Sequence, residues 1–265
     1  MEWAGASATS HPVTRYAYDA YGNLTSTTNP NGGVTAIVYD DVLNLFPLST
    51  YNALGQLTTS EYFGVNGVPL DAGDGYKGVW GQLKSTTDAN NQKATNSYDV
   101  FGRSTFAVGP LDSFSYPTTM AVYTLNAQYT KVTSQQRITS GQAATIDATQ
   151  FSDGLGRVIQ TKSPTAQAGQ YVVNGQTTYT SRGLPSRKYV PFFSMNPIDT
   201  IETIDTTRAN TQLFYDAMGR MMKAVNPDGT YSTMSYDDWA STTIDENGHQ
   251  QKSYYDAYGR LIKKE

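Results

Sequence analysis

The sequence predicts an all-β protein made of repeated antiparallel hairpins. Two kinds of turn alternate along the chain, and the distances between them are nearly constant. The 265 residues include 20 tyrosines and 23 glycines but only 16 % charged residues, a mixture that suits strands and tight turns. No segment has the periodicity of an amphipathic helix. One unit of two strands and two turns is about 20 residues long, so the chain holds many copies.

The first kind of turn has the pattern Asp-x-x-Gly. It occurs at Asp19 to Gly22, Asp99 to Gly102, Asp153 to Gly156, Asp216 to Gly219 and Asp256 to Gly259, with Asn52 to Gly55 as a close relative. A carboxylate or amide in the first place can accept backbone N–H groups ahead of it, and Gly tolerates the positive φ that closes a three-residue hairpin loop. The pattern predicts a type I turn followed by a left-handed residue.

The second kind of turn has Asn or Asp in the first place and Gly or Asn in the fourth. Its copies are Asn29 to Gly32, Asp88 to Asn91, Asn226 to Gly229 and Asp245 to Gly248. The first-turn positions Asp40, Asp99, Asp237 and Asp256 each follow a second turn by 11 residues. Asn29 and Asn226 follow a first turn by 10 residues. This alternation fixes the strands between the turns.

Hairpin geometry predicts which side chains face one another. The first turn residue opposes the residue after Gly, and the residue before the turn opposes the next one along. Asp99 therefore opposes Arg103, and Tyr98 opposes Ser104. The same rule pairs Asp153 with Arg157, Asp216 with Arg220, Asp256 with Arg260, Tyr18 with Leu24, Tyr51 with Leu57, Tyr215 with Met221 and Tyr255 with Leu261. Each pair contributes roughly 0.2–1 kcal/mol, so many units must stack.

The repeat is weaker in the middle of the chain. Residues 15–265 are predicted to be a single repeat region, with degenerate copies and longer loops at 105–210, after a flexible N-terminal stretch at 1–14. Gly78 to Gly81 is interpreted as a first turn with Gly in place of Asp. "YVVNGQTTY", Tyr171 to Tyr179, predicts a hairpin around Asn174-Gly175. Pro185, Pro191 and Pro197 are interpreted as a long connection.

Composition excludes several classes of function. A net charge of −4 without a dense run of Lys and Arg argues against nucleic-acid binding. The sequence contains no cysteine and no apolar stretch long enough to span a membrane, and its first residues show no signal-peptide pattern. We therefore expect no nucleic-acid partner and no membrane span.

Candidate chemical groups have simpler structural explanations. Each repeated Asp stands where a turn requires a carboxylate. Asp71 and Asp74 lie in a glycine-rich loop without the oxygen ligands of a calcium site. His249 is predicted to oppose Asp245, without a nucleophile beside it. We expect no catalytic residue, no metal site and no cofactor, and hence no enzyme.

The tyrosines allow two interpretations. A row of exposed rings could stack on sugars, which would make the chain a surface module that binds carbohydrate. The alternative, which we favour, is a tyrosine ladder in which each ring packs against the next unit and its cross-strand Leu or Met. The residues of any binding site stay unknown at this stage.

Tyr-Asp-x-x-Gly-Arg-Leu, seen at Tyr255 to Leu261 and in variants at Tyr18, Tyr51, Tyr98, Tyr215 and Tyr236, resembles the YD repeat of the Rhs family. It is similar to the shell-forming component of bacterial insecticidal toxin complexes, and teneurins carry a similar shell. The resemblance implies a curved sheet that spirals into a hollow shell around a toxin or other cargo polypeptide.

The resemblance also implies partners and a location. The chain would be one segment of a shell, joined to further repeat segments, in a larger polypeptide that is secreted or lies at the cell surface. The family's C-terminal core has no counterpart in this sequence, so no self-cleaving residue is carried over and no toxin domain is identified. An isolated segment exposes strand edges, and we expect these to permit self-association.

Overall fold

A computed structural model describes residues 12–265, and every regular element in that range is a β-strand. The all-β prediction is therefore confirmed. Of the stretch at 1–14 that was predicted to be flexible, residues 1–11 lie outside the described residues. No helix in residues 12–265 is long and apolar enough to cross a membrane. The chain divides into two compact units, Met1–Ala121 with Gln135–Thr145 and Val122–Ser134 with Ile146–Glu265.

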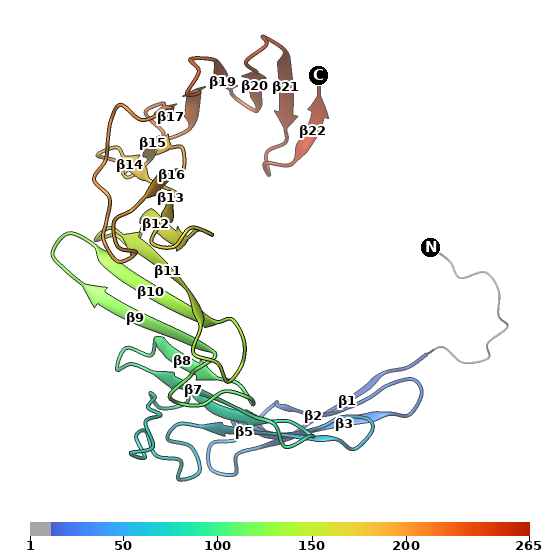
Figure 1. Ribbon diagram of the computed structural model, residues 1–265. Coiled ribbons are helices and arrows are strands. Elements are labelled where there is room, and N and C mark those ends of the chain that lie inside the picture. Colours follow the sequence, from blue (N-terminus) through green and yellow to red (C-terminus); the bar gives the residue numbers. More distant parts are fainter. Residues whose placement is uncertain (1–11) are drawn as a thin grey trace. The chain divides into compact units, whose positions relative to one another are not determined.

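Sequential hairpins build the sheet of the first unit (Figure 1). Its strands are β1 (Arg15–Tyr18), β2 (Leu24–Thr28), β3 (Val34–Tyr39), β4 (Pro47–Tyr51), β5 (Leu57–Tyr62), β6 (Leu83–Thr87), β7 (Lys93–Tyr98) and β8 (Ser104–Val108). Each strand pairs antiparallel with the next one in the chain. Three further strands, β9 (Thr119–Leu125), β10 (Thr130–Arg137) and β11 (Thr145–Ser152), have residues in both units.

The second unit contains two hydrogen-bonded series of strands. The first joins β11, β12 (Val158–Pro164), β13 (Tyr171–Asn174) and β16 (Phe192–Ser194). The second is an eight-stranded sheet made of β14 (Thr177–Tyr179), β15 (Pro185–Tyr189), β17 (Asn210–Tyr215), β18 (Met221–Val225), β19 (Tyr231–Asp237), β20 (Ala240–Ile244), β21 (Gln250–Tyr255) and β22 (Leu261–Lys264). Along the chain, β14 and β15 of the second series come before β16 of the first, and the other six strands of the second series follow it.

The register follows the sequence prediction. Tyr98 pairs with Ser104, Tyr18 with Leu24, Tyr51 with Leu57, Tyr215 with Met221 and Tyr255 with Leu261. The glycines that close the turns have positive φ, for example +79° at Gly102 and +76° at Gly259. Asn91 takes the same conformation at +59°, as expected for Asn in place of Gly.

One regularity was not predicted: most first-turn hairpins carry a β-bulge, whereas the β19–β20 hairpin at Asp237 pairs without one. In β7 and β8 the register shifts between Ser97 and Tyr98, and the same shift precedes Tyr18, Tyr39, Tyr62, Ser152, Tyr179, Tyr215 and Tyr255. The second-turn hairpins β2–β3, β6–β7, β18–β19 and β20–β21 pair without a shift. Since a bulge adds local twist and disrupts the ladder, the two kinds of hairpin alternate in geometry as well as in sequence.

The predicted hairpin at Tyr171–Tyr179 is wrong. Strand β13 pairs with β12 and β16, whereas β14 pairs with β15. Asn174-Gly175 is therefore the point at which the chain leaves one series of strands and enters the other. Gly175 has the positive φ of a turn, +67°, but a turn signal fixes only the local backbone and not the strand that the chain joins next.

Pro185 begins β15 instead of opening a long connection. Thr180 donates its N–H to the Leu184 carbonyl, and Gly183 donates to the Thr180 carbonyl, 2.7 and 2.9 Å. "YTSRGLP" is therefore a complete first turn with Thr in place of Asp. The long connection runs from residue 190 to 209, with β16 inside it.

The structure also corrects the assignment of Gly78. The N–H of Phe63 donates to the Gln82 carbonyl at 2.8 Å, and the N–H of Gly81 donates to the Phe63 carbonyl at 2.7 Å. These are the bonds of a first turn, so Phe63 stands in the place of Asp and residues 64–80 are an insertion inside the turn. Spacing from Asp88 could not reveal this, because the insertion lies before Gly81.

The Asn52 turn lies at the opposite end of the strands from the first turns. In a sheet of sequential hairpins, successive turns alternate between the two ends of the strands. The turn before β4 is the Asp40 first turn, so the β4–β5 turn from Asn52 to Gly55 belongs with the second turns, and β4 and β5 pair without a bulge. The motif copy at Tyr51 therefore has the sequence of a first turn and the position of a second turn.

Buried apolar side chains are few among the described residues. They are Phe63, Val65, Val108, Phe151, Val173 and Tyr189. Phe63 packs edge-on to Tyr98 at 6.2 Å between ring centroids, and Phe151 packs in the same way on Tyr129 at 5.4 Å. The remaining stability of each unit depends on strand pairing and on contacts that repeat from hairpin to hairpin.

Candidate functional site

The first turn is built around its Asp side chain. In the Asp99 copy, Oδ1 accepts the N–H groups of Phe101 and Arg103 at 2.9 and 3.0 Å, while the Gly102 N–H donates to the Asp99 carbonyl at 2.9 Å. The copies at Asp19, Asp153, Asp216 and Asp256 repeat this arrangement. The repeated aspartates therefore cap turns, as the sequence predicts.

The second Asp oxygen holds the Arg that follows Gly. The Nε–Oδ2 distance is 2.7 Å in Asp99–Arg103, Asp153–Arg157, Asp216–Arg220 and Asp256–Arg260. This confirms the predicted cross-strand ion pairs. The hydrogen bond from Arg157 lowers the pKa of the Asp153 carboxyl below its ordinary value, because it stabilises the charged form. The pair holds the planar guanidinium in one orientation.

In four places the tyrosine before a first turn binds the preceding first-turn hairpin. Its hydroxyl donates to the carbonyl of the first residue after that hairpin's turn. The bonds are Tyr39 to Leu24 at 3.3 Å and Tyr98 to Leu83, Tyr179 to Val158 and Tyr236 to Met221 at 3.0 Å. The acceptor lies beside the β-bulge, where the ladder is disrupted and a carbonyl can be left for a side chain.

In two of these four contacts, the Arg of the preceding hairpin also lies over the tyrosine ring. The guanidinium of Arg220 lies 4.4 Å from the centroid of the Tyr236 ring, and that of Arg157 lies 3.9 Å from the Tyr179 ring. A cation over an aromatic face is worth about 0.5–1 kcal/mol at an exposed site. Tyr and Arg from neighbouring hairpins therefore form a clamp, which we call the Tyr–Arg clamp, with the bulge carbonyl as its third member.

Two of the arginines lie over an aromatic ring in their own turn. Arg103 and Arg260 lie over the ring in their own turn, Phe101 at 5.2 Å and Tyr258 at 5.3 Å. Every residue of the Tyr-Asp-x-x-Gly-Arg motif thus has a structural role. Tyr and Arg join hairpins, Asp caps the turn and holds Arg, and Gly supplies the positive φ. The sequence analysis did not predict these hydroxyl bonds.

His249 and Asp245 lie together at a second turn, as predicted. His249 Nδ1 is 3.0 Å from Asp245 Oδ2, and the histidine side chain is 78 % exposed. The backbone N–H of His249 and its ring lower the pKa of the Asp245 carboxyl. The pair is an exposed turn contact, equivalent in position to the Asp–Arg pairs.

The loop with Asp71 and Asp74 pairs its carboxylates with lysines. Asp71 Oδ2 lies 2.8 Å from Lys77 Nζ, and Asp74 Oδ2 lies 3.6 Å from Lys84 Nζ. In residues 12–265 no group of three or more metal-ligating side chains comes together. These carboxylates are therefore arranged as ion pairs and as acceptors for their own loop.

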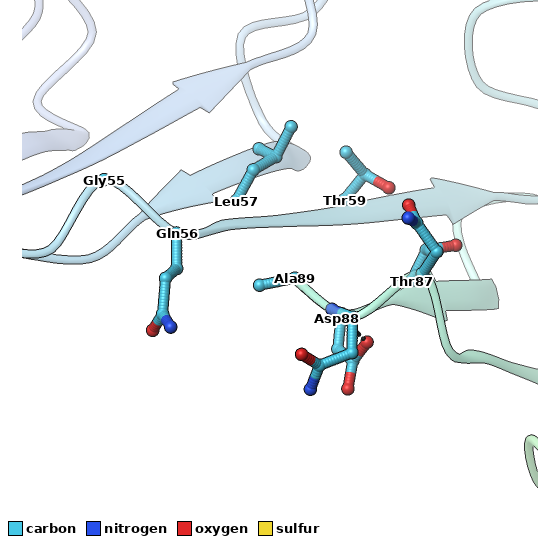
Figure 2. Close-up of a pocket in the computed structure, with 9 residues that line it drawn as sticks. Gly55, Gln56, Leu57, Thr59, Thr87, Asp88 and Ala89 are labelled. Carbon is cyan, nitrogen blue, oxygen red and sulfur yellow. Dashed lines mark hydrogen bonds between the residues drawn. The ribbon is translucent and has the colours of Figure 1, made fainter.

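An open groove of about 320 Å³ lies between the β4–β5 turn and the neighbouring β6–β7 turn (Figure 2). Gly55, Gln56 and Leu57 form one side, and Thr87, Asp88 and Ala89 form the other. The Oδ1 atom of Asp88 is engaged by the N–H groups of Asn90 and Gln92, both at 2.8 Å. The groove is the ordinary gap between adjacent turns, and it gathers no set of polar groups aimed at a ligand.

A buried lysine in the second unit was missed by the sequence reasoning. Lys162 lies on β12 with a side chain that is 0 % exposed. Its Nζ donates to the carbonyls of Asn196, Pro197 and Thr200 at 3.0–3.2 Å and to Glu202 Oε1 at 2.7 Å. The lysine therefore holds the 195–202 segment, which is part of the connection from 190 to 209, against strand β12. Nothing in the spacing of Lys162 and Glu202 reveals their contact.

Comparison with known proteins gives one sequence match and several structural ones. A family model described as RHS Repeat matches residues 7–34. No curated protein matches the sequence. The solved structure "Crystal Structure of TcdB2-TccC3" is similar over 96 % of this chain, with a TM-score of 0.69 and 17 % identity.

Two related structures agree with this match. TcdB2-TccC3 without its hypervariable C-terminal region gives a TM-score of 0.70 with 14 % identity, and a Photorhabdus luminescens Tc holotoxin pore gives 0.68 with 14 % identity. Each is similar over 96 % of this chain, which spans only 17 % of those chains and 15 % of the first. Residues 7–34 thus match an RHS repeat, and the chain has the fold of a small part of the TcdB2-TccC3 chain.

Proposed function

We propose that this chain is a structural segment of an encapsulating β-shell that sequesters a toxin or other cargo polypeptide. The observation that carries the proposal is the Tyr–Arg clamp: the motif residues serve to join one hairpin to the next. A contact that repeats in this way extends a sheet by one unit at a time, as in other repeat proteins.

The chemistry of the motif supports a structural role over an enzymatic one. The Asp and Arg side chains bind each other, and the tyrosine hydroxyls bind backbone carbonyls. A catalytic group would need a free proton donor, acceptor or nucleophile directed at a substrate. We therefore propose that the chain is not an enzyme and needs no cofactor.

The partners follow from the same proposal. Further repeat segments would continue the sheet, and an enclosed cargo polypeptide would contact one of its faces. The similarity to TcdB2-TccC3 and to a Tc holotoxin pore supports assembly within a toxin complex. It also supports a location outside the producing cell or at its surface.

Electron microscopy of the complete polypeptide that contains this segment tests the proposal. A hollow particle with density inside it is the expected result, and limited proteolysis should cleave the enclosed polypeptide only after the particle is opened. A compact particle without an interior would contradict the proposal, as would cargo that is cleaved equally fast with the shell intact.

A further inference from the structure

The chain contains several Asn-Gly pairs, and the structure places them differently. They are Asn31-Gly32, Asn66-Gly67, Asn174-Gly175 and Asn247-Gly248. Because Gly has no Cβ, its backbone nitrogen can reach the side-chain carbonyl of a preceding Asn with little hindrance. All of the pairs can therefore undergo one reaction, in which this nitrogen attacks the side-chain amide and closes a succinimide ring. The folded structure decides which pair is arranged for it.

The side chain of Asn174 folds back onto its own glycine. The Gly175 N–H donates to Asn174 Oδ1 at 2.7 Å. Oδ1 is bonded to Cγ, so this contact holds the nitrogen beside the carbon that it would attack, as in a near-attack conformer. The backbone of the pair is also held. The Asn174 carbonyl accepts the Thr161 hydroxyl at 3.3 Å, and the Gly175 carbonyl accepts the Thr177 hydroxyl at 2.9 Å.

The glycine nitrogens of two other pairs are directed at backbone carbonyls. The Gly32 N–H donates to the Asn29 carbonyl at 3.0 Å, and the Gly248 N–H donates to the Asp245 carbonyl at 3.1 Å. Each of these bonds closes a second turn. The nitrogen is therefore directed at the carbonyl that starts its turn and not at the side chain of the preceding Asn.

Asn66 has a different backbone conformation. Its φ is +47°, in a turn in which the Val68 N–H donates to the Val65 carbonyl at 3.0 Å. In residues 12–265, Asn174 is the only Asn of the four pairs whose Oδ1 accepts the N–H of the glycine after it. The structure thus separates Asn174 from three pairs with the same sequence.

The Asn174-Gly175 pair is open to water, although its neighbours are buried. Asn174 and Gly175 are exposed, whereas Val173 is 0 % and Gln176 is 3 % exposed. The Gln176 side chain donates to the Glu202 carbonyl at 3.3 Å. The pair is therefore an accessible link between two buried residues, at the point where the chain passes from β13 to β14.

We propose that Asn174 is a site of spontaneous deamidation, favoured by the folded structure over the other three Asn-Gly pairs. Hydroxide takes the proton of the Gly175 nitrogen, and the lone pair of this nitrogen forms a bond to Asn174 Cγ. The bond between Cγ and Nδ2 breaks, and Nδ2 takes a proton from water and leaves as ammonia. The product of this step is a succinimide. The proposal does not depend on the shell function.

Water then opens the succinimide in one of two ways. Cleavage of the bond between Cγ and the Gly175 nitrogen gives aspartate at position 174. Cleavage of the bond between that nitrogen and the main-chain carbonyl carbon gives isoaspartate, whose backbone runs through Cβ and Cγ and is longer by one CH2 group. In both cases an amide and water become a carboxylic acid and ammonia, without any oxidant or reductant.

Incubation of the whole 265-residue chain in mildly alkaline buffer tests the proposal. Peptide mapping by mass spectrometry measures the rate at each pair, and methylation by an isoaspartyl methyltransferase identifies the isoaspartate. We expect Asn174 to react about 10- to 100-fold faster than Asn31, Asn66 and Asn247, since misplacing reacting groups by about 1 Å costs up to about 100-fold. In guanidinium chloride, which unfolds the chain, the four pairs should react at similar rates.

Two variants serve as matched controls. Asn174→Gln keeps an amide but lengthens the side chain by one CH2 group, so it should abolish the product at this position. Asn247→Gln makes the same change in a pair whose glycine N–H is bound elsewhere. This second variant should leave the rate at Asn174 unchanged.

Three results would overturn the proposal. The first is a reaction at another Asn-Gly pair of the folded chain that is as fast as at Asn174. The second is the same preference for Asn174 in the unfolded chain, which would assign the preference to the flanking sequence. The third is cleavage of the chain after residue 174, which would show that Asn174 Nδ2 attacks the main-chain carbonyl instead.

Discussion

The hydroxyl of Tyr236 lies 3.0 Å from the carbonyl oxygen of Met221, in the hairpin that precedes it. This bond joins two hairpins through a side chain, beyond the backbone ladder between their strands. Tyr236→Phe should therefore lower the free energy of unfolding by about 0.5–1.5 kcal/mol, the net value of one hydrogen bond. Urea denaturation measures the change. Tyr231→Phe is the control, because Tyr231 is 52 % exposed and should change stability by less than about 0.5 kcal/mol. Equal effects of the two changes would contradict the clamp.

Lys162 should be among the most costly residues to replace. Lys162→Met leaves the Glu202 carboxylate and three carbonyls without their common donor. Breaking one partner of a buried ion pair costs about 3–5 kcal/mol, and thermal or urea unfolding measures the loss. The double variant Lys162→Met with Glu202→Gln should recover part of it, because the buried charge is gone. The control Lys93→Ala removes an exposed partner of Glu61 and should cost about 0–1 kcal/mol.

Two glycines in one turn allow the cost of a left-handed backbone conformation to be measured apart from the cost of a steric clash. Gly156 has φ +78° and Gly154 does not have a positive φ, and an added Cβ would meet nothing within 4 Å at either residue. Gly156→Ala should destabilise the protein by about 1–2 kcal/mol, the cost of the left-handed conformation for other residues. Gly154→Ala should be neutral, or stabilise by up to about 1 kcal/mol through the unfolded chain. Similar losses at both positions would refute this account of the turn.

Asp40 should titrate well below an ordinary aspartate. Its carboxylate accepts the N–H groups of Phe46, Leu45 and Leu43 at 2.7–2.8 Å. The bond from Phe46 is the first cause of a pKa lowered to about 2. Because the folded pKa lies below the unfolded one, about 3.9, the contribution of Asp40 to stability is complete above pH 4 and is lost as the pH falls toward 2.

Carboxyl NMR measures that titration directly, with a midpoint near pH 2 as the expected result. Asp40→Asn provides the second measurement. The stability difference between the unmodified chain and this variant should shrink as the pH falls from 4 to 2. A midpoint near 3.9, or a difference independent of pH in this window, would show that the three N–H bonds do not hold the charged form.

The carbohydrate hypothesis makes a separate prediction. If the tyrosine rings act as a ladder, the chain should give no reproducible signal on a glycan array. Binding that disappears when Tyr215 and Tyr255 are both changed to Ala would favour a carbohydrate-binding surface instead. Changing Tyr258 to Ala is the control, since this 86 % exposed ring lies in a turn, outside the ladder.

Much of the fold followed from turn chemistry. Asp99 with Gly102 predicted the turn, and the turn predicted the pairs Asp99–Arg103 and Tyr98–Ser104, because a three-residue hairpin loop leaves one register. Turns in which the first residue is not Asp or Asn were harder to recognise from the sequence. Phe63 replaces Asp in a turn opened by an insertion, and Thr180 replaces Asp in another, so pattern matching misplaced the first and undervalued the second.

The sequence by itself determined the class of fold, the positions of most turns and the register across them, since these depend on residues within one hairpin. Tertiary structure alone decided which strands meet after a turn. In the tertiary structure β13 pairs with β16 and β14 pairs with β15. Lys162 contacts Glu202, and the Tyr236 hydroxyl donates to the Met221 carbonyl. Those contacts join residues from different hairpins, and their partners are chosen by packing and by the bulge that offers a carbonyl, which no local pattern specifies.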